Sequence, residues 1–188
     1  MKILGMLSAL ALGIAAPAAL AAPLCPALGV ATDCNIVLTI GPGGSVTSSA
    51  GASSSSTYDG SDDVLVGIIN NSGAPLSSIA LSSPGNPVFE FDGDGIDAFG
   101  AVENAGNPDT TGYGGPNAYF SGISSDFSTG TVNFKNPIAA GGTDYFSLEE
   151  AITFNQIGGA TPEPSTLLLF ATGAVGLAGS LRRKMLSR

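Results

Sequence analysis

The middle of the chain alternates short apolar runs with clusters of turn residues. The clearest runs are residues 36–40, 64–69, 78–81, 88–91, 118–120, 131–135 and 145–148, and Gly, Pro, Asn, Asp or Ser follow most of them. In two runs apolar residues recur at every second position, at Val132 and Phe134 and at Phe146 and Leu148. Such runs, separated by turn residues, are typical of antiparallel sheets. We therefore predict an all-β fold, an antiparallel β-sandwich over residues 22–160.

Residues 41–57 interrupt this pattern, because Gly, Ser and Thr dominate them. The composition is typical of a long loop, and it also suits a polar hairpin at the edge of a sheet. Both interpretations are open from the sequence, and we assign the segment as a Gly/Ser-rich loop within the predicted sandwich.

The N-terminal segment differs in character from the middle of the chain. Lys2 precedes an apolar stretch over residues 3–16, and the small-residue sequence Ala19-Leu20-Ala21 follows. A basic start, an apolar stretch and a small-residue site are the three parts of a secretory signal peptide. A membrane helix is the alternative, but Gly and Pro interrupt a stretch that is already short for a span. We expect residues 1–21 to be removed after export through the Sec translocon.

The C-terminal segment is a second apolar stretch that ends in basic residues. Residues 165–181 lie at the lower limit of length for a helix that spans a bilayer. Arg182, Arg183 and Lys184 follow directly, and basic flanks stay on the cytoplasmic side of a membrane. The sequence predicts a transmembrane helix over 165–181 and a basic cytoplasmic tail over 182–188. The middle of the chain then lies outside the inner membrane.

The tripeptide Pro162-Glu163-Pro164 stands directly before this apolar stretch. Its prolines hold the chain extended, which is the conformation that a protease needs in its substrate. The tripeptide, the apolar segment and the basic cluster, in this order, closely resemble the PEP-CTERM sorting signal over residues 161–188. The resemblance implies that an exosortase, an integral membrane transpeptidase-like enzyme, recognises the tail and cleaves near the tripeptide. A permanent C-terminal anchor is the alternative interpretation.

The resemblance also implies a setting, because proteins with this signal occur in Gram-negative bacteria that make exopolysaccharide and biofilm or floc matrix. The sequence around residues 58–73 and 145–149 is similar to an ectodomain common among such proteins, for which no activity carries over. Exopolysaccharide is therefore an expected partner, and the contact with the inner membrane is expected to be transient.

Charge is distributed unevenly along the chain. Lys135 is the one Lys or Arg within residues 22–162, where fourteen of the fifteen acidic residues lie. So acidic a surface repels phosphate backbones, which excludes nucleic acid as a partner. It attracts divalent cations or basic partners, or it serves only to keep an exported protein soluble. The chain has no His, which removes Ser-His-Asp and Cys-His nucleophiles and His-ligated zinc.

The two cysteines, Cys25 and Cys34, follow the expected cleavage site closely. Export implies an oxidising compartment, so we predict a disulfide between them.

The best candidate for a ligand site is the sequence from Asp92 to Asp97. Three carboxylates, Asp92, Asp94 and Asp97, are spaced by glycines that allow tight turns, and they suit a hard cation such as calcium. Glu103 falls at the twelfth position of an EF-hand-like count, but Ile96 stands where a further oxygen ligand belongs. The alternative is an acidic turn whose Asp side chains bond local amides.

These features predict a non-enzymatic protein of the cell surface or the extracellular matrix, without a certain cofactor. The first alternative is a calcium- or carbohydrate-binding surface module, with Tyr113 and Tyr119 as candidates for stacking on a sugar. The second and less favoured alternative is a small glycoside hydrolase that uses paired carboxylates.

Overall fold

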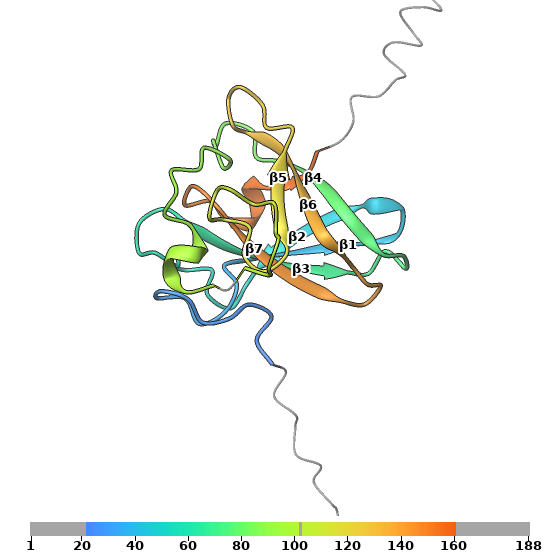
Figure 1. Cartoon of the computed structure of the whole chain (residues 1–188). Coiled ribbons are helices and arrows are strands. Elements are labelled where there is room, and N and C mark those ends of the chain that lie inside the picture. Colours follow the sequence, from blue (N-terminus) through green and yellow to red (C-terminus); the bar gives the residue numbers. More distant parts are fainter. Residues whose placement is uncertain (1–21, 102, 161–188) are drawn as a thin grey trace, which may run out of the picture.

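The computed structural model describes residues 22–101 and 103–160, which form two four-stranded sheets packed face to face (Figure 1). The first sheet has the strand order β2-β1-β3-β7 and the second has the order β5-β6-β4-β8. The strands are β1 (Ile36–Ile40), β2 (Val46–Ala50), β3 (Val64–Asn70), β4 (Leu76–Ser82), β5 (Ala118–Ser121), β6 (Thr129–Ile138), β7 (Thr143–Leu148) and β8 (Gly158–Gly159). Three 3₁₀ turns join them, η1 (Pro42–Gly44), η2 (Ile96–Phe99) and η3 (Phe154–Gln156). The predicted all-β fold with two sheets is confirmed.

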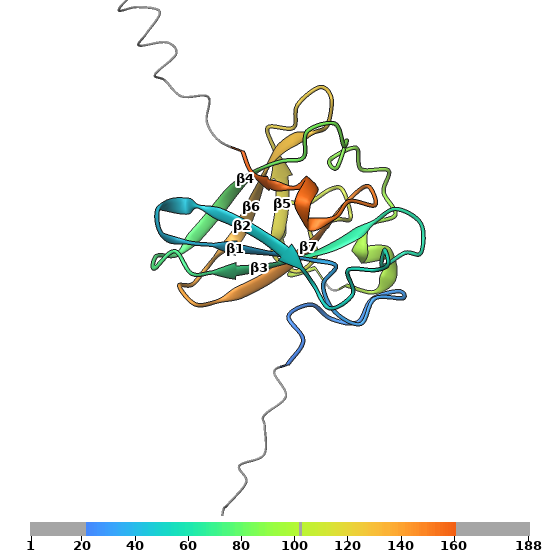
Figure 2. The same ribbon diagram turned by 180° about the vertical axis from the view of Figure 1, so that it is seen from behind.

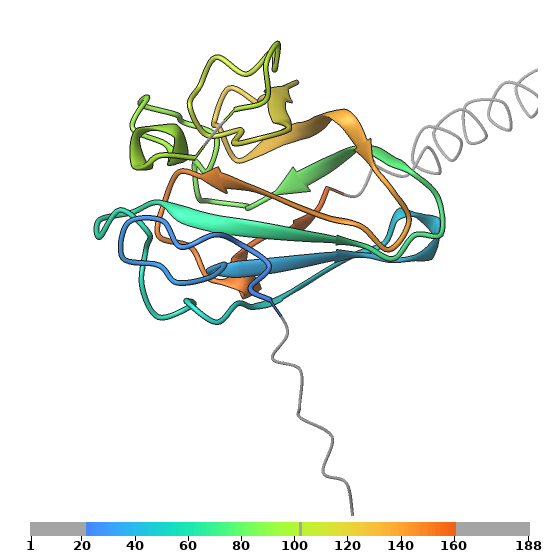
Figure 3. The same cartoon turned by 60° about the horizontal axis from the view of Figure 1, so that its bottom comes forward.

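The core lies between the two sheets, which Figure 3 shows as separate layers. Ile36, Leu38 and Ile40 of β1 are buried, while the two residues between them are only half-buried. β6 alternates in the same way, because successive side chains of a strand point to opposite faces. The inner faces of both sheets therefore contribute to one apolar cluster.

One strand pair departs from the antiparallel expectation. β1 pairs antiparallel with β2 but parallel with β3, in the register Ile36 to Val66. Parallel neighbours require a crossover connection, and the chain supplies it by running back along β2 to the start of β1 and then crossing to β3 through residues 51–63. The segment 41–57 thus contains the edge strand β2, so only parts of it are loop.

Residues 88–91, which we expected to form a strand, form a turn at Val88 and Phe89 instead. The N–H of Glu90 donates to the carbonyl of Pro87 at 2.9 Å. Val88 and Phe89 are both buried, and two neighbouring buried side chains suit a turn beneath the core better than an alternating strand. The expectation of a strand was wrong here, but Val88 is a core residue.

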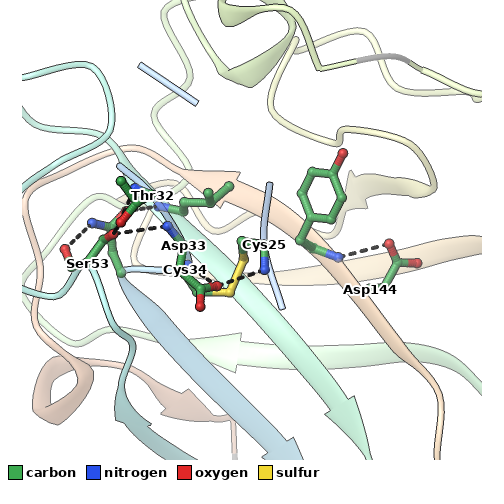
Figure 4. The surroundings of a disulfide bond; sticks show 9 residues. Cys25, Thr32, Asp33, Cys34, Ser53 and Asp144 are labelled. Carbon is green, nitrogen blue, oxygen red and sulfur yellow. Dashed lines mark hydrogen bonds between the residues drawn. A yellow bond between two sulfur atoms is a disulfide. The ribbon is translucent and has the colours of Figure 1, made fainter. Parts of the chain in front are cut away.

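The N-terminal loop covers the outer face of β3, which is why β3 is buried on both faces. Cys25 and Cys34 form the predicted disulfide in this loop, with their Cα atoms 5.0 Å apart. Asp33 accepts hydrogen bonds from the N–H groups of both cysteines (Figure 4). A Cβ on Gly67 of β3 would lie 2.4 Å from the Cys34 sulfur, so the loop packs closely because that residue is glycine.

The described chain begins and ends at opposite ends of the sandwich, as Figures 1 and 2 both show. Its last residue, Ala160, donates its N–H to the carbonyl of Ala80 at 2.9 Å, beside the short edge strand β8. Within 22–101 and 103–160 no helix has the length and apolar character of a membrane span. The predicted signal peptide over 1–21 and helix over 165–181 lie outside the described residues, as do Pro162, Glu163, Pro164, Arg182, Arg183 and Lys184.

Candidate functional site

Two buried carboxylates meet at one end of the first sheet. β3 and β7 pair antiparallel with Val64 opposite Leu148, so the residues just beyond these strand ends, Asp63 and Glu149, also lie opposite each other. Asp63 is 1% exposed and Glu149 is 8% exposed. One carboxylate oxygen from each of these two and from the exposed Asp62 lies within 4.8 Å of the others. Strand register alone brings together residues that are distant in the sequence.

The loop after residues 88–91 adds two more carboxylates at the same place. An oxygen of Asp92, one of Asp94 and one of Glu149 lie within 4.8 Å of one another. Asp92 Oδ1 accepts the N–H of Asp94 at 3.2 Å across Gly93, whose φ of 98° favours glycine. A Cβ on Gly95 would lie 2.4 Å from the Gly112 carbonyl oxygen, so this loop packs directly on the following one.

The Tyr113 hydroxyl lies at the centre of these carboxylates. Its oxygen is 2.6 Å from Glu149 Oε2, 2.8 Å from Asp94 Oδ1, 3.1 Å from Asp92 Oδ1 and 3.4 Å from Asp63 Oδ1. Tyr113 is fully buried, and its carbonyl accepts the N–H of Ser147 in β7 at 2.8 Å. We call Asp63, Asp92, Asp94, Tyr113 and Glu149 the Tyr113 cluster.

Burial and mutual repulsion set the electrostatics of the Tyr113 cluster. Burial raises the pKa of Asp63 to about 8, against a hydrogen bond of 2.7 Å that the Tyr58 hydroxyl donates to its Oδ2. Burial also raises the pKa of Glu149 and of the Tyr113 phenol. The contact between Asp92 and Asp94 lowers the pKa of the first and raises that of the second.

Among the described residues, the cluster has no cationic side chain to offset its charge. Lys135 is the one basic residue there, and its Nζ donates to the carbonyl of Ala105. The Tyr113 cluster is therefore an assembly of acidic oxygen groups that repel one another and share the Tyr113 hydroxyl as a hydrogen-bond partner.

A second group of carboxylates, Asp97, Glu103 and Asp109, has oxygens within 4.8 Å of one another. Asp109 accepts hydrogen bonds from the N–H groups of Thr111, Gly112 and Gly114 at 3.3, 3.1 and 3.0 Å, and from the Thr111 hydroxyl at 2.9 Å. Asp97 Oδ1 is buried without a hydrogen-bond partner. Burial, and then Glu103, raise the pKa of Asp97 to about 7.

The structure thus divides the predicted calcium ligands between two groups. Asp92 and Asp94 converge, as expected, but Asp97 lies with Glu103 and Asp109. The reason is η2, which starts at the fully buried Ile96 and turns the following residue away from the Asp92–Asp94 loop. Sequence reasoning missed Asp63, Glu149 and Tyr113 as members of the site. Tyr113 is also too buried to stack on a sugar.

The comparisons with known proteins concern the C-terminal tail. Residues 160–184 match the family model of the PEP-CTERM protein-sorting motif. No curated protein and no solved structure matches the chain. The predicted exosortase sorting signal is therefore confirmed, and it marks an exported, surface-directed protein.

Proposed function

We propose that this exported exosortase substrate is a non-enzymatic protein of the cell surface or of the exopolysaccharide-rich matrix. The main support for the proposal is the position in the chain at which the sorting motif begins. The match starts at residue 160, and Ala160 forms the last described backbone contact with the second sheet. Cleavage near Pro162–Pro164 therefore removes no described strand, and the released or transferred product is the whole sandwich.

Two properties of the described domain suit this role. The Cys25–Cys34 disulfide is buried, which suits an oxidising exterior. The acidic residues keep a secreted domain soluble and repel nucleic acid. Exosortase is the partner that the tail implies, and exopolysaccharide is a proposed one.

The non-enzymatic assignment rests on the available side chains. The chain has no His. Two acids have a strongly raised pKa: Asp63 is 1% exposed and out of reach of a polymeric substrate, and Oδ1 of Asp97 is buried. Turnover of a polysaccharide that an Asp94→Asn substitution abolishes would overturn this part of the proposal.

The test of processing is the intact mass of the protein recovered from the culture medium and from the membranes of the native host. We expect a species that starts near Ala22 and ends near Pro162–Pro164. A Pro162→Ala, Pro164→Ala double substitution should leave the tail attached, while Thr166→Ala serves as the matched control. A full tail in the membrane fraction of the unmodified protein would instead establish a permanent C-terminal anchor.

A further inference from the structure

We propose that Pro162 and Pro164 stop the second sheet from adding the sorting tail as a further length of strand, so that the Pro-Glu-Pro motif stays off the sheet. The inference deepens the function proposed above and rests on it for the role of the tail. The observation behind it is the register of β8 on β4, which holds whether or not the tail is cleaved.

The register of β8 fixes which residues of the tail would face β4. The two strands pair antiparallel with Gly159 opposite Leu81. The next residue, Ala160, donates its N–H to the carbonyl of Ala80 at 2.9 Å, so these two residues form a hydrogen-bonded position of the ladder. Because hydrogen-bonded and non-hydrogen-bonded positions alternate in an antiparallel ladder, the next hydrogen-bonded position along β4 is Ser78.

A continued ladder would place Pro162 opposite Ser78. A proline has no N–H to donate at such a position, and its ring would stand where the amide hydrogen of another residue points at the partner strand. Pro164 falls two residues further on, so it would meet β4 in the same way. The N–H groups that this part of the tail does have, at Thr161 and Glu163, would point away from β4. The tail therefore offers β4 no donor beyond residue 160.

The edge of β4 beyond β8 is open to another strand. Within residues 22–101 and 103–160, β4 pairs with β6 along one side, and only the two residues of β8 pair with it on the other. From Leu76 to Ile79 this edge has no charge and no proline, which are devices that keep an edge strand from pairing. A groove of about 290 Å³ lies beside it, and the residues that line the groove include Ile40, Val46, Leu76, Ile79 and Ala160. Since the edge itself lacks these devices, the prolines of the tail supply them.

A sorting motif that paired with β4 would be a poor substrate. A processing enzyme would first have to break the hydrogen bonds between the motif and the sheet, and only then could it bind the motif as an extended segment. The four residues 161–164 separate Ala160 from the apolar segment 165–181. Even a short extension of the ladder would therefore include the whole tripeptide.

The test is hydrogen exchange at single backbone amides of the full chain, purified in detergent. In the unmodified chain we expect the amide of Ser78, which faces the open edge, to exchange rapidly, and the amide of Ile79, which faces β6, to be protected. A Pro162→Val, Pro164→Val double substitution restores both N–H groups and adds residues that favour strands. It should slow exchange at Ser78 by about tenfold or more and leave Ile79 unchanged.

The matched control is a Thr161→Val, Glu163→Val double substitution, which places the same two side chains at the neighbouring positions and keeps both prolines. It should leave exchange at Ser78 rapid. Adding Ser78→Pro to the proline double variant removes the edge N–H, and the amides of residues 161–164 should then exchange as fast as they do without that pairing. Protection at Ile79 reports that the fold is intact in every variant.

Three results would overturn the proposal. They are slow exchange at Ser78 in the unmodified chain, rapid exchange at Ser78 in the proline double variant, and equal protection of Ser78 in the matched control. No exosortase is present in this experiment. Its outcome is therefore separate from the mass measurement that tests whether the tail is cleaved.

Discussion

The two acidic groups of the sandwich contain the same kind of side chain and satisfy it in different ways. Asp109 lies in a turn whose own N–H groups point at it, so its charge stabilises the loop that contains it. In the Tyr113 cluster, carboxylates from distant segments face one another across a single hydroxyl. The contrast teaches that acidic side chains in one domain can be stabilised either by backbone donors of their own loop or by a hydroxyl that several distant segments share.

The largest effect is expected at Asp109, whose hydrogen-bond donors all come from its own loop. Asp109→Ala removes an acceptor for three amides and a hydroxyl, and we expect it to lower the free energy of unfolding by about 3 kcal/mol. Urea denaturation measures this loss. Asp109→Asn retains one oxygen and should cost less. An equal loss in the two variants would show that the remaining oxygen does not satisfy the donors of the loop.

The next prediction is a gain in stability. Glu149→Gln relieves repulsion in the Tyr113 cluster and should raise the free energy of unfolding by about 1 kcal/mol. Urea denaturation measures the change, and Glu90→Gln, which removes an equal charge from an exposed side chain, is the matched control and should have a smaller effect. A loss of stability in Glu149→Gln would indicate that the hydrogen bond from the Tyr113 hydroxyl outweighs the repulsion.

Tyr113→Phe sharpens the comparison at the centre of the cluster. The variant leaves Glu149 without its phenolic donor, and we expect the free energy of unfolding to fall by about 1 kcal/mol. Urea denaturation of the variant and of the unmodified chain measures the loss. An unchanged free energy of unfolding would show that the carboxylates of the cluster do not depend on this hydroxyl.

The smallest effect concerns pH and the unpartnered oxygen of Asp97. Burial and Glu103 raise the pKa of Asp97 to about 7 from an ordinary 3.8, so the folded protein holds this proton more tightly than the unfolded chain. That contribution to stability is complete below the ordinary pKa and is lost as the pH rises through about 7. Asp97→Asn should therefore gain in Tm relative to the unmodified chain between pH 5 and about pH 8. A constant difference across this range would show that Asp97 does not titrate there.

The sequence was most informative where the signal is local. Alternation in residues 131–135 and 145–148 predicted strands, and the two cysteines predicted their own bridge. The spacing of Asp92 and Asp94 around glycine likewise identified two of the four clustered carboxylates. In each case the residues that interact are close together in the chain.

The rest depended on pairings between distant segments. Only the register of β3 against β7 shows that Asp63 faces Glu149. The parallel pairing of β1 with β3 follows from the path of residues 51–63, whose composition is that of any polar loop. Tyr113 lies in a glycine-rich stretch typical of an exposed turn, and packing of the Asp92–Asp94 loop against it is what buries it.

The pairing of β3 with β7 also has a consequence for the order of events during secretion. An exported chain emerges from its N-terminus, and residues 64–69 must wait for residues 143–148 before the first sheet can close. Such long-range pairing is slow, because closing the intervening loop costs entropy before the contacts between the two strands can offset that cost. Folding therefore finishes only when nearly the whole domain has crossed and the sorting tail is about to follow. The Tyr113 cluster, which joins Asp63 to Glu149, is therefore assembled at that moment and not before.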